Sequence, residues 1–173
     1  MTKTKKIILM GLLTGIGLIL AVVEIMIPMS AVVPGAKLGL ANIVNLLGLV
    51  LIGISGGFQI LLLRIIIASL LMGTFMTIPF AMSFFGGLAG YLAMAVFYYF
   101  AKNKFSVIGI SVVGAVFHNV GQIITASVIM GTSAVFYYLP YLTLIAVPTG
   151  LGIGVMTLFS LRYLDKTKIN QTG

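Results

Sequence analysis

The fold is decided around residues 33–45, which read VPGAKLGLANIVN. This stretch is a short polar interruption between long apolar runs. Pro34-Gly35 predicts a turn, because proline fixes φ and glycine adopts backbone conformations that other residues avoid. Asn42 and Asn45 begin the next apolar run, and a helix brings residues three apart onto one face. The stretch therefore predicts a loop and a helix start that border a small-molecule site.

The composition is that of a membrane protein. Of the 173 residues 61% are hydrophobic and 7% are charged, and the mean hydropathy is +1.25. Soluble domains carry about 25% charged residues. We therefore expect one integral membrane domain over residues 1–173, a multi-pass protein of the cell membrane. The net charge of +8 is explained by where the charges lie, so nucleic acid is not an expected partner.

The apolar runs predict helices, because a helix needs about 20 apolar residues to cross the hydrocarbon core. A break at Pro79 divides a run that would otherwise give an improbably long helix of about 40 residues. We expect an all-α bundle of six transmembrane helices, at 7–27, 39–55, 57–78, 80–101, 106–130 and 135–161.

Lysine and arginine predict the orientation of the bundle, because cytoplasmic loops carry an excess of both. Three clusters of basic residues lie before the first span, between the fourth and fifth spans and after the sixth, and an even number of spans places all three on one side. On the other side, Lys37 is the one lysine or arginine in the loops. Both the N- and the C-terminus should therefore be cytoplasmic. The clusters are Lys3, Lys5 and Lys6; Lys102 and Lys104; and Arg162, Lys166 and Lys168.

Polar side chains inside the predicted spans, with Lys37 just outside them, converge at one depth in the outer half of the membrane. Polar and ionisable groups in this environment are costly and are functional candidates. The alternative is that the amides and the histidine hydrogen-bond between helices as packing contacts, and that Glu24 simply pairs with Lys37. The candidate substrate-binding residues are Glu24, Lys37, Asn42, Asn45, His118, Asn119 and Gln122.

Arg64 is a further ionisable residue in the third predicted span. It lies about eight residues from the predicted cytoplasmic end, which is too far in depth for a direct bond to Glu24. We expect its side chain to extend toward the membrane surface or to bond a backbone carbonyl. The aromatic stretch 136–141 is typical of a membrane-interface belt, although it could also cover a ligand that has a ring.

Glycine and alanine recur four residues apart, a spacing that lets helices approach closely in lipid. Most such pairs predict packing inside the bundle. Gly11 and Gly15 lie in the cytoplasmic half of the first span, where they could instead contact another membrane subunit. Pro148 with Gly150 predicts a kink in the last span. The pairs are Gly11/Gly15, Gly17/Ala21, Gly53/Gly57, Gly86/Gly90 and Gly150/Gly154.

The residues do not favour catalysis. The sequence has two carboxylates, Glu24 and Asp165, which should lie on opposite sides of the membrane, and it has one histidine and no cysteine. This rules out a paired-carboxylate site or an aspartate-rich magnesium–diphosphate motif, and it makes a zinc or haem site unexpected. There is no Gly-rich phosphate loop of the Walker type. We expect no enzyme activity, no ATP hydrolysis by this chain, and no metal or cofactor.

Three stretches carry a resemblance to a known family: PGAKLGLANI at 34–43, GAVFHNVGQ at 114–122 and YYLP at 137–140. Over roughly residues 7–162 the chain resembles the bacterial Gx transporter family, whose members are often labelled heptaprenyl diphosphate synthase component I. That family in turn is similar to the substrate-binding S components of energy-coupling factor (ECF) transporters. S components are six-helix membrane proteins that bind a vitamin or similar nutrient under the loop after helix one.

The resemblance implies roles for particular residues and partners. Segment 33–41 would be the gating loop. The four polar residues Asn42, Asn45, His118 and Gln122 would form the wall of the site. Gly11, Gly15 and Gly17 would form the face that docks a transmembrane coupling subunit driven by two ATPase subunits. The usual S-component pattern on helix one is based on alanine, whereas this chain has glycines with Thr14 between them.

Three functions are compatible with the sequence. The first is a membrane subunit that captures a small nutrient or an isoprenoid or quinone precursor for an ECF-type transporter. The second is a non-catalytic accessory membrane subunit of a heptaprenyl diphosphate synthase or of a quinone-pathway complex. The third is a structural or electron-transfer-linked membrane partner in which the polar residues serve packing alone. The first predicts a polar site in the outer half, and the second predicts a stable complex with a soluble synthase.

Overall fold

The computed structural model describes residues 2–26, 39–101 and 104–170, with the side chains of Ile25 and of 165–170 left out. Lys37 and the first part of the expected gating loop, 33–38, lie outside the described residues. The described chain is all-α, as the sequence predicts. Its elements are α1 (Lys3–Ile25), α2 (Asn42–Leu51), α3 (Ile54–Leu71), α4 (Ile78–Ala101), α5 (Val107–Met130), a 3₁₀ helix η2 (Ser133–Tyr138) and α6 (Leu139–Asn170).

Five stretches of the described chain are long and apolar enough to cross a membrane. They bear large exposed apolar side chains along their length, which suits a lipid environment. The chain is therefore a multi-pass membrane protein. The five stretches are Lys3–Glu24, Ile54–Leu71, Ile78–Ala101, Val107–Met130 and Ser133–Leu164.

The second predicted span is shorter than the sequence indicates. The run 39–55 yields the 10-residue helix α2, which is about 15 Å long and too short to cross the hydrocarbon core alone. Seven of its residues are buried, and it packs against α1, α3, α4, α5 and α6. A short helix is tolerated at membrane depth here because protein, rather than lipid, surrounds it.

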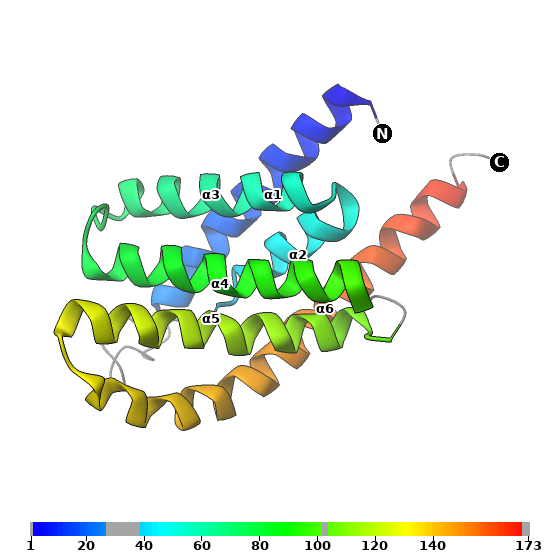
Figure 1. Cartoon of the computed structure of the whole chain (residues 1–173). Coiled ribbons are helices and arrows are strands. Elements are labelled where there is room, and N and C mark those ends of the chain that lie inside the picture. The colour runs from blue at the N-terminus through cyan, green and yellow to red at the C-terminus, as the bar shows by residue number, and fades with distance from the viewer. Residues whose placement is uncertain (1, 27–38, 102–103, 171–173) are drawn as a thin grey trace.

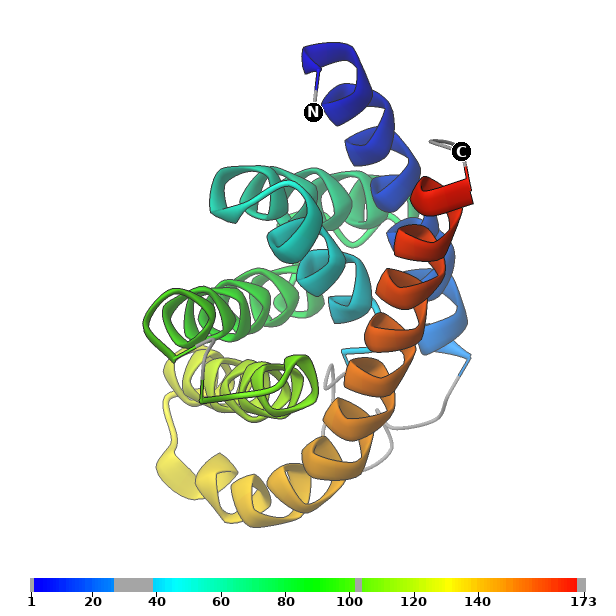
Figure 2. The ribbon, with the colours of Figure 1, turned by 90° about the vertical axis from the view of Figure 1, so that its right-hand side faces the viewer.

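The long helices form a bundle around α2. In Figure 1, α3, α4 and α5 lie side by side while α1 and α6 cross them at an angle. Apolar clusters join α2 to its neighbours, with Leu46 and Leu49 packed near Tyr91 on α4 and Val44 packed near Leu13 on α1. Figure 2 shows α6 as a continuous curved helix, and Pro148 inside it accounts for the bend.

Local signals fix the ends of the helices. Ser106 caps α5 by accepting a hydrogen bond from the Gly109 N–H, and Gly131 ends α5 in the left-handed conformation. Pro79 lies in the first turn of α4, where its missing N–H costs no helical hydrogen bond. The predicted division of this run into two helices is therefore confirmed, but the break lies between Leu71, where α3 ends, and Ile78, where α4 begins, so that Pro79 lies inside α4.

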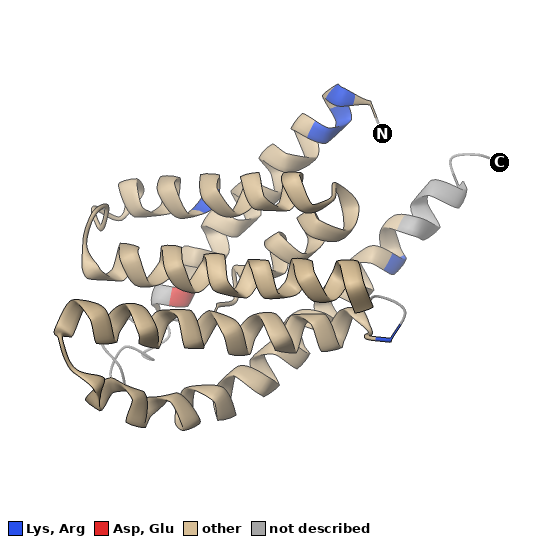
Figure 3. Ribbon diagram, in the orientation of Figure 1, with Lys and Arg blue, Asp and Glu red and all other residues tan. Residues whose placement is uncertain are grey.

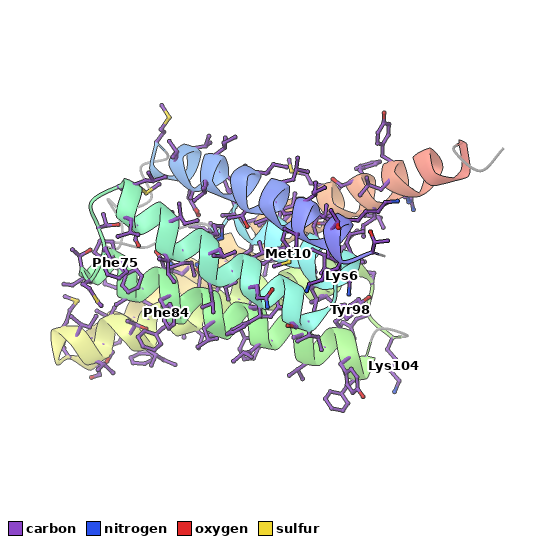
Figure 4. All side chains as sticks on the ribbon, turned by 90° about the horizontal axis from the view of Figure 1, so that it is seen from above. Lys6, Met10, Phe75, Phe84, Tyr98 and Lys104 are labelled. Carbon is purple, nitrogen blue, oxygen red and sulfur yellow. The ribbon has the colours of Figure 1, made fainter. Side chains whose placement is uncertain are left out.

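Basic residues gather at one end of the bundle. Figure 3 shows them near the start of α1, near the end of α6 and at the α4–α5 connection, and Figure 1 places both chain ends there. In Figure 4, Lys6 and Lys104 lie at this end and Phe75 lies at the opposite one. The aromatic residues of η2 and the start of α6 are exposed, among them Tyr137 at 88%, as expected of an interface belt.

Glycines bring α4 and α5 into close contact. A Cβ added at Gly90 would lie 2.7 Å from the carbonyl oxygen of Gly114, and one added at Gly86 would lie 3.0 Å from that of His118. Both contacts are with backbone, which cannot move without displacing the helix. The pairs Gly86/Gly90 and Gly150/Gly154 therefore pack inside the bundle, the latter against Val112 and Ile108 of α5.

Gly90→Ala should lower the free energy of unfolding by about 1–3 kcal/mol, because the added methyl group forces α4 away from α5. The thermal midpoint should fall accordingly. Gly152→Ala is the matched control, since nothing lies within 4 Å of the added Cβ and alanine favours helix. Far-UV circular dichroism of the detergent-solubilised protein measures both. Equal midpoints for the two variants would contradict the close packing of α4 on α5.

Candidate functional site

A small polar cavity lies inside the bundle, between α1, the start of α2, α3, α4 and α5. Its volume is about 30 Å³, which leaves room for about two water molecules. Of the predicted site residues Glu24, Asn42 and His118 line it, together with Arg64. The other described residues that line it are Ala21, Gly39, Ile65, Ala68, Ser69, Met72, Thr74, Phe80 and Ser83.

Glu24, near the end of α1, fixes the chain that leads into α2. Its side chain is buried, and its Oε1 accepts hydrogen bonds from the backbone N–H groups of Gly39 and Leu40, the latter at 3.2 Å. A carboxylate is favourable at this position because the N-terminal end of a helix is electropositive. Gly39 has φ +81°, a conformation that suits glycine. Glu24 thus has a structural role in addition to lining the cavity.

Asn42 and Asn45 lie on one face of α2, as their spacing predicts. Both are buried, and the Asn45 Nδ2 donates to the Asn42 Oδ1 at 3.1 Å. Asn42 reaches the cavity, whereas Asn45 is fully buried behind it and does not line it. Asn45 therefore orients the amide that faces the cavity.

His118 and Gln122 lie one turn apart on α5 and are in contact. The Gln122 Nε2 and the His118 Nε2 are 3.1 Å apart, and both residues are buried. Gly86 of α4 lies against both of them, so the close approach of α4 and α5 holds this pair in place. His118 lines the cavity and Gln122 does not.

Asn119 has the packing role that the sequence left open as an alternative. Its Nδ2 donates to the backbone carbonyl of Leu142 at 2.8 Å and so joins α5 to α6. It does not line the cavity. Interhelical amide bonds of this kind stabilise membrane bundles.

The expectation that the Arg64 side chain extends toward the membrane surface is wrong, because the side chain is buried in the bundle. Because α3 begins at Ile54, Arg64 lies about 10 Å from the Leu71 end, and that end is the one away from the basic cluster. The side chain is 8% exposed and lines the same cavity as Glu24, whose charge acts on it. It therefore does not extend to the membrane surface. Ionisable residues are rare inside membrane spans. This was the sequence signal that could have placed Arg64 in the site.

The hydroxyl residues Ser69, Thr74 and Ser83 also line the cavity, and sequence reasoning missed them. Ser69 donates to the carbonyl of Ile66 and Ser83 to that of Pro79. Nothing in their sequence context distinguishes them from other small polar residues of a membrane helix. They meet only because α4 packs back against α3.

The three glycines predicted to dock a partner do not share a face. A Cβ on Gly17 would lie 2.7 Å from the Arg64 Cδ and 2.8 Å from the Val44 Cγ2, so Gly17 belongs to the interior of the bundle. The turn of the helix places Gly17 on the side of α1 opposite Gly15. Gly11 and Gly15 have nothing within 4 Å of an added Cβ. These two remain available to a partner.

A family model described as heptaprenyl diphosphate synthase component I matches residues 13–160. No curated protein and no solved structure matches the chain. The matched range includes α2 to α5 in full and all the described residues that line the cavity. The chain belongs to the family of heptaprenyl diphosphate synthase component I.

Proposed function

We propose that this protein is a membrane-embedded ligand-binding subunit, similar in role to the S component of an ECF transporter. It captures a small nutrient or an isoprenoid or quinone precursor. The observation that carries the proposal is the polar cavity, in which Glu24, Asn42, Arg64 and His118 meet inside an otherwise apolar bundle. Polar and ionisable groups gathered at this depth are costly, and they mark ligand pathways more often than bare packing.

The charge distribution supports an outer-half site. The described basic residues at the ends of helices gather at the end of the bundle that holds both chain ends (Figure 3). By the positive-inside rule this end is cytoplasmic. Glu24 lies next to the last residue of α1, at the opposite end of that helix from Lys3. The cavity would therefore open toward the outside, and both termini would be cytoplasmic.

The second candidate function is an accessory subunit of a prenyl diphosphate synthase, and the description of the family favours it. The full sequence has two carboxylates, Glu24 and Asp165. An aspartate-rich magnesium–diphosphate site therefore has to come from another chain. In this function the polar cavity would be structural, and a soluble synthase would be the partner.

Asn42→Ala and His118→Ala should each weaken ligand binding by on the order of tenfold, because each removes a buried polar contact. Native mass spectrometry of protein purified gently from its host membrane measures the occupancy of the bound molecule. Ser160→Ala is the control, since its exposed hydroxyl bonds only the backbone of its own helix. Unchanged occupancy in both cavity variants would contradict the site. Wild-type protein that carries a soluble synthase and no small molecule would favour the second function.

Gly15→Leu should reduce co-purification with a transmembrane coupling subunit and its ATPases by at least about tenfold, because the new side chain fills an open stripe of α1. Ligand occupancy should not change. Gly152→Leu on α6 is the matched control, since it too has nothing within 4 Å of an added Cβ. An intact complex with Gly15→Leu would place the docking surface elsewhere.

A further inference from the structure

We infer that the cavity binds the anionic end of its ligand, a carboxylate or a phosphate group, and that Arg64 supplies the countercharge. This inference rests on the proposed ligand-binding function and narrows it to a chemical class. It follows from the hydrogen-bond donors that the bundle leaves unused around the cavity, and from the size of the space.

The first observation is the guanidinium of Arg64. The residue is 8% exposed, and its Nε has no hydrogen-bond partner among the described residues. A buried donor without a partner costs about 1–3 kcal/mol, and more when it is charged. Guanidinium groups bind carboxylates and phosphates through parallel hydrogen bonds. The Nε donor lacks an acceptor, and a negatively charged one suits a guanidinium.

The second observation is the amide of Asn42. Its Oδ1 already accepts from Asn45, while its Nδ2 is buried and has no partner among the described residues. Asn42 begins α2, and the N-terminal end of a helix attracts anions. An unused neutral donor and an unused cationic donor thus line the same cavity.

Two further titratable residues line the cavity, Glu24 and His118. The Oε1 of Glu24 accepts from two backbone N–H groups at the approach to α2, although its charge also acts on Arg64. His118 is in contact with the Gln122 amide through its Nε2. Glu24 therefore binds the chain that leads into α2 and contributes charge near Arg64, while the Nε of Arg64 and the Nδ2 of Asn42 remain for a ligand.

The size of the cavity limits what it holds. A volume of about 30 Å³, room for about two waters, admits a carboxylate or the oxygens of one phosphate. The whole of a larger nutrient does not fit there. The cavity would therefore anchor the acidic end of a ligand.

The test uses three anions as probes, namely acetate, inorganic phosphate and diphosphate, against chloride at equal ionic strength. The thermal midpoint of the detergent-solubilised protein is followed by far-UV circular dichroism. At least one probe should raise the wild-type midpoint by about 3–5 °C. A response to acetate alone identifies a carboxylate ligand, and a response to phosphate or diphosphate alone identifies a phosphate ligand.

Arg64→Gln should abolish the shift, and Arg64→Lys should retain part of it. Arg162→Gln, at an exposed position near the end of α6, should leave it unchanged. Asn42→Asp keeps the acceptor for Asn45 and places a carboxylate in the cavity, so it should raise the midpoint without any probe and remove the response to anions. This variant keeps the test decisive if Arg64→Gln does not fold.

The inference is overturned if no probe shifts the wild-type midpoint, or if Arg64→Gln and wild type shift equally. Native mass spectrometry separates its failure from that of the proposed function. A neutral or cationic molecule bound to wild type and lost in Asn42→Ala would refute the anionic class and leave ligand capture standing. Wild-type protein with no bound molecule would refute ligand capture itself.

Discussion

The carboxylate of Glu24 holds the start of α2 against the end of α1, and the rest of the interior depends on that contact. It accepts hydrogen bonds from the backbone N–H groups of Gly39 and Leu40, which no water would satisfy inside a bilayer. The 10-residue helix α2 can then lie inside the bundle, in contact with all five long helices. This places the amide of Asn42 beside Glu24, Arg64 and His118.

Close packing through glycine sets the other wall of the cavity. Gly86 and Gly90 of α4 lie against the backbone of α5, where dispersion contacts replace the hydrophobic effect that lipid does not provide. Gly17 of α1 leaves room for the side chain of Arg64. The glycines therefore act on function indirectly, because they fix the depth and direction of the side chains that reach the cavity.

The polar residues of the interior divide into two kinds. Asn45 and Gln122 each contact a residue that lines the cavity, and Asn119 joins α5 to α6. Asn42 and Arg64 line the cavity and keep buried donors that no described residue uses, whereas the unpartnered side-chain atoms of Asn45, Asn119 and Gln122 are acceptor oxygens of residues that do not line it. Buried polar groups in native proteins usually have partners. The unused pair is therefore the feature that favours a ligand over packing.

The sequence by itself determined that this is a membrane protein, that it is all-α and which family it belongs to. It also determined the division of the chain near Pro79 and the shared face of Asn42 and Asn45. Hydropathy, proline geometry and helical periodicity are local properties, so they can be read without the tertiary structure. The sequence also selected Glu24, Asn42 and His118, since polar groups are rare in apolar spans. Only the tertiary structure decided that α2 is too short to span, that Gly17 faces inward and that Arg64 joins the cavity. These three features depend on where α3 begins and on how the helices are rotated against each other. Contacts between distant segments determine the start of α3 and the rotation of the helices, and local periodicity does not.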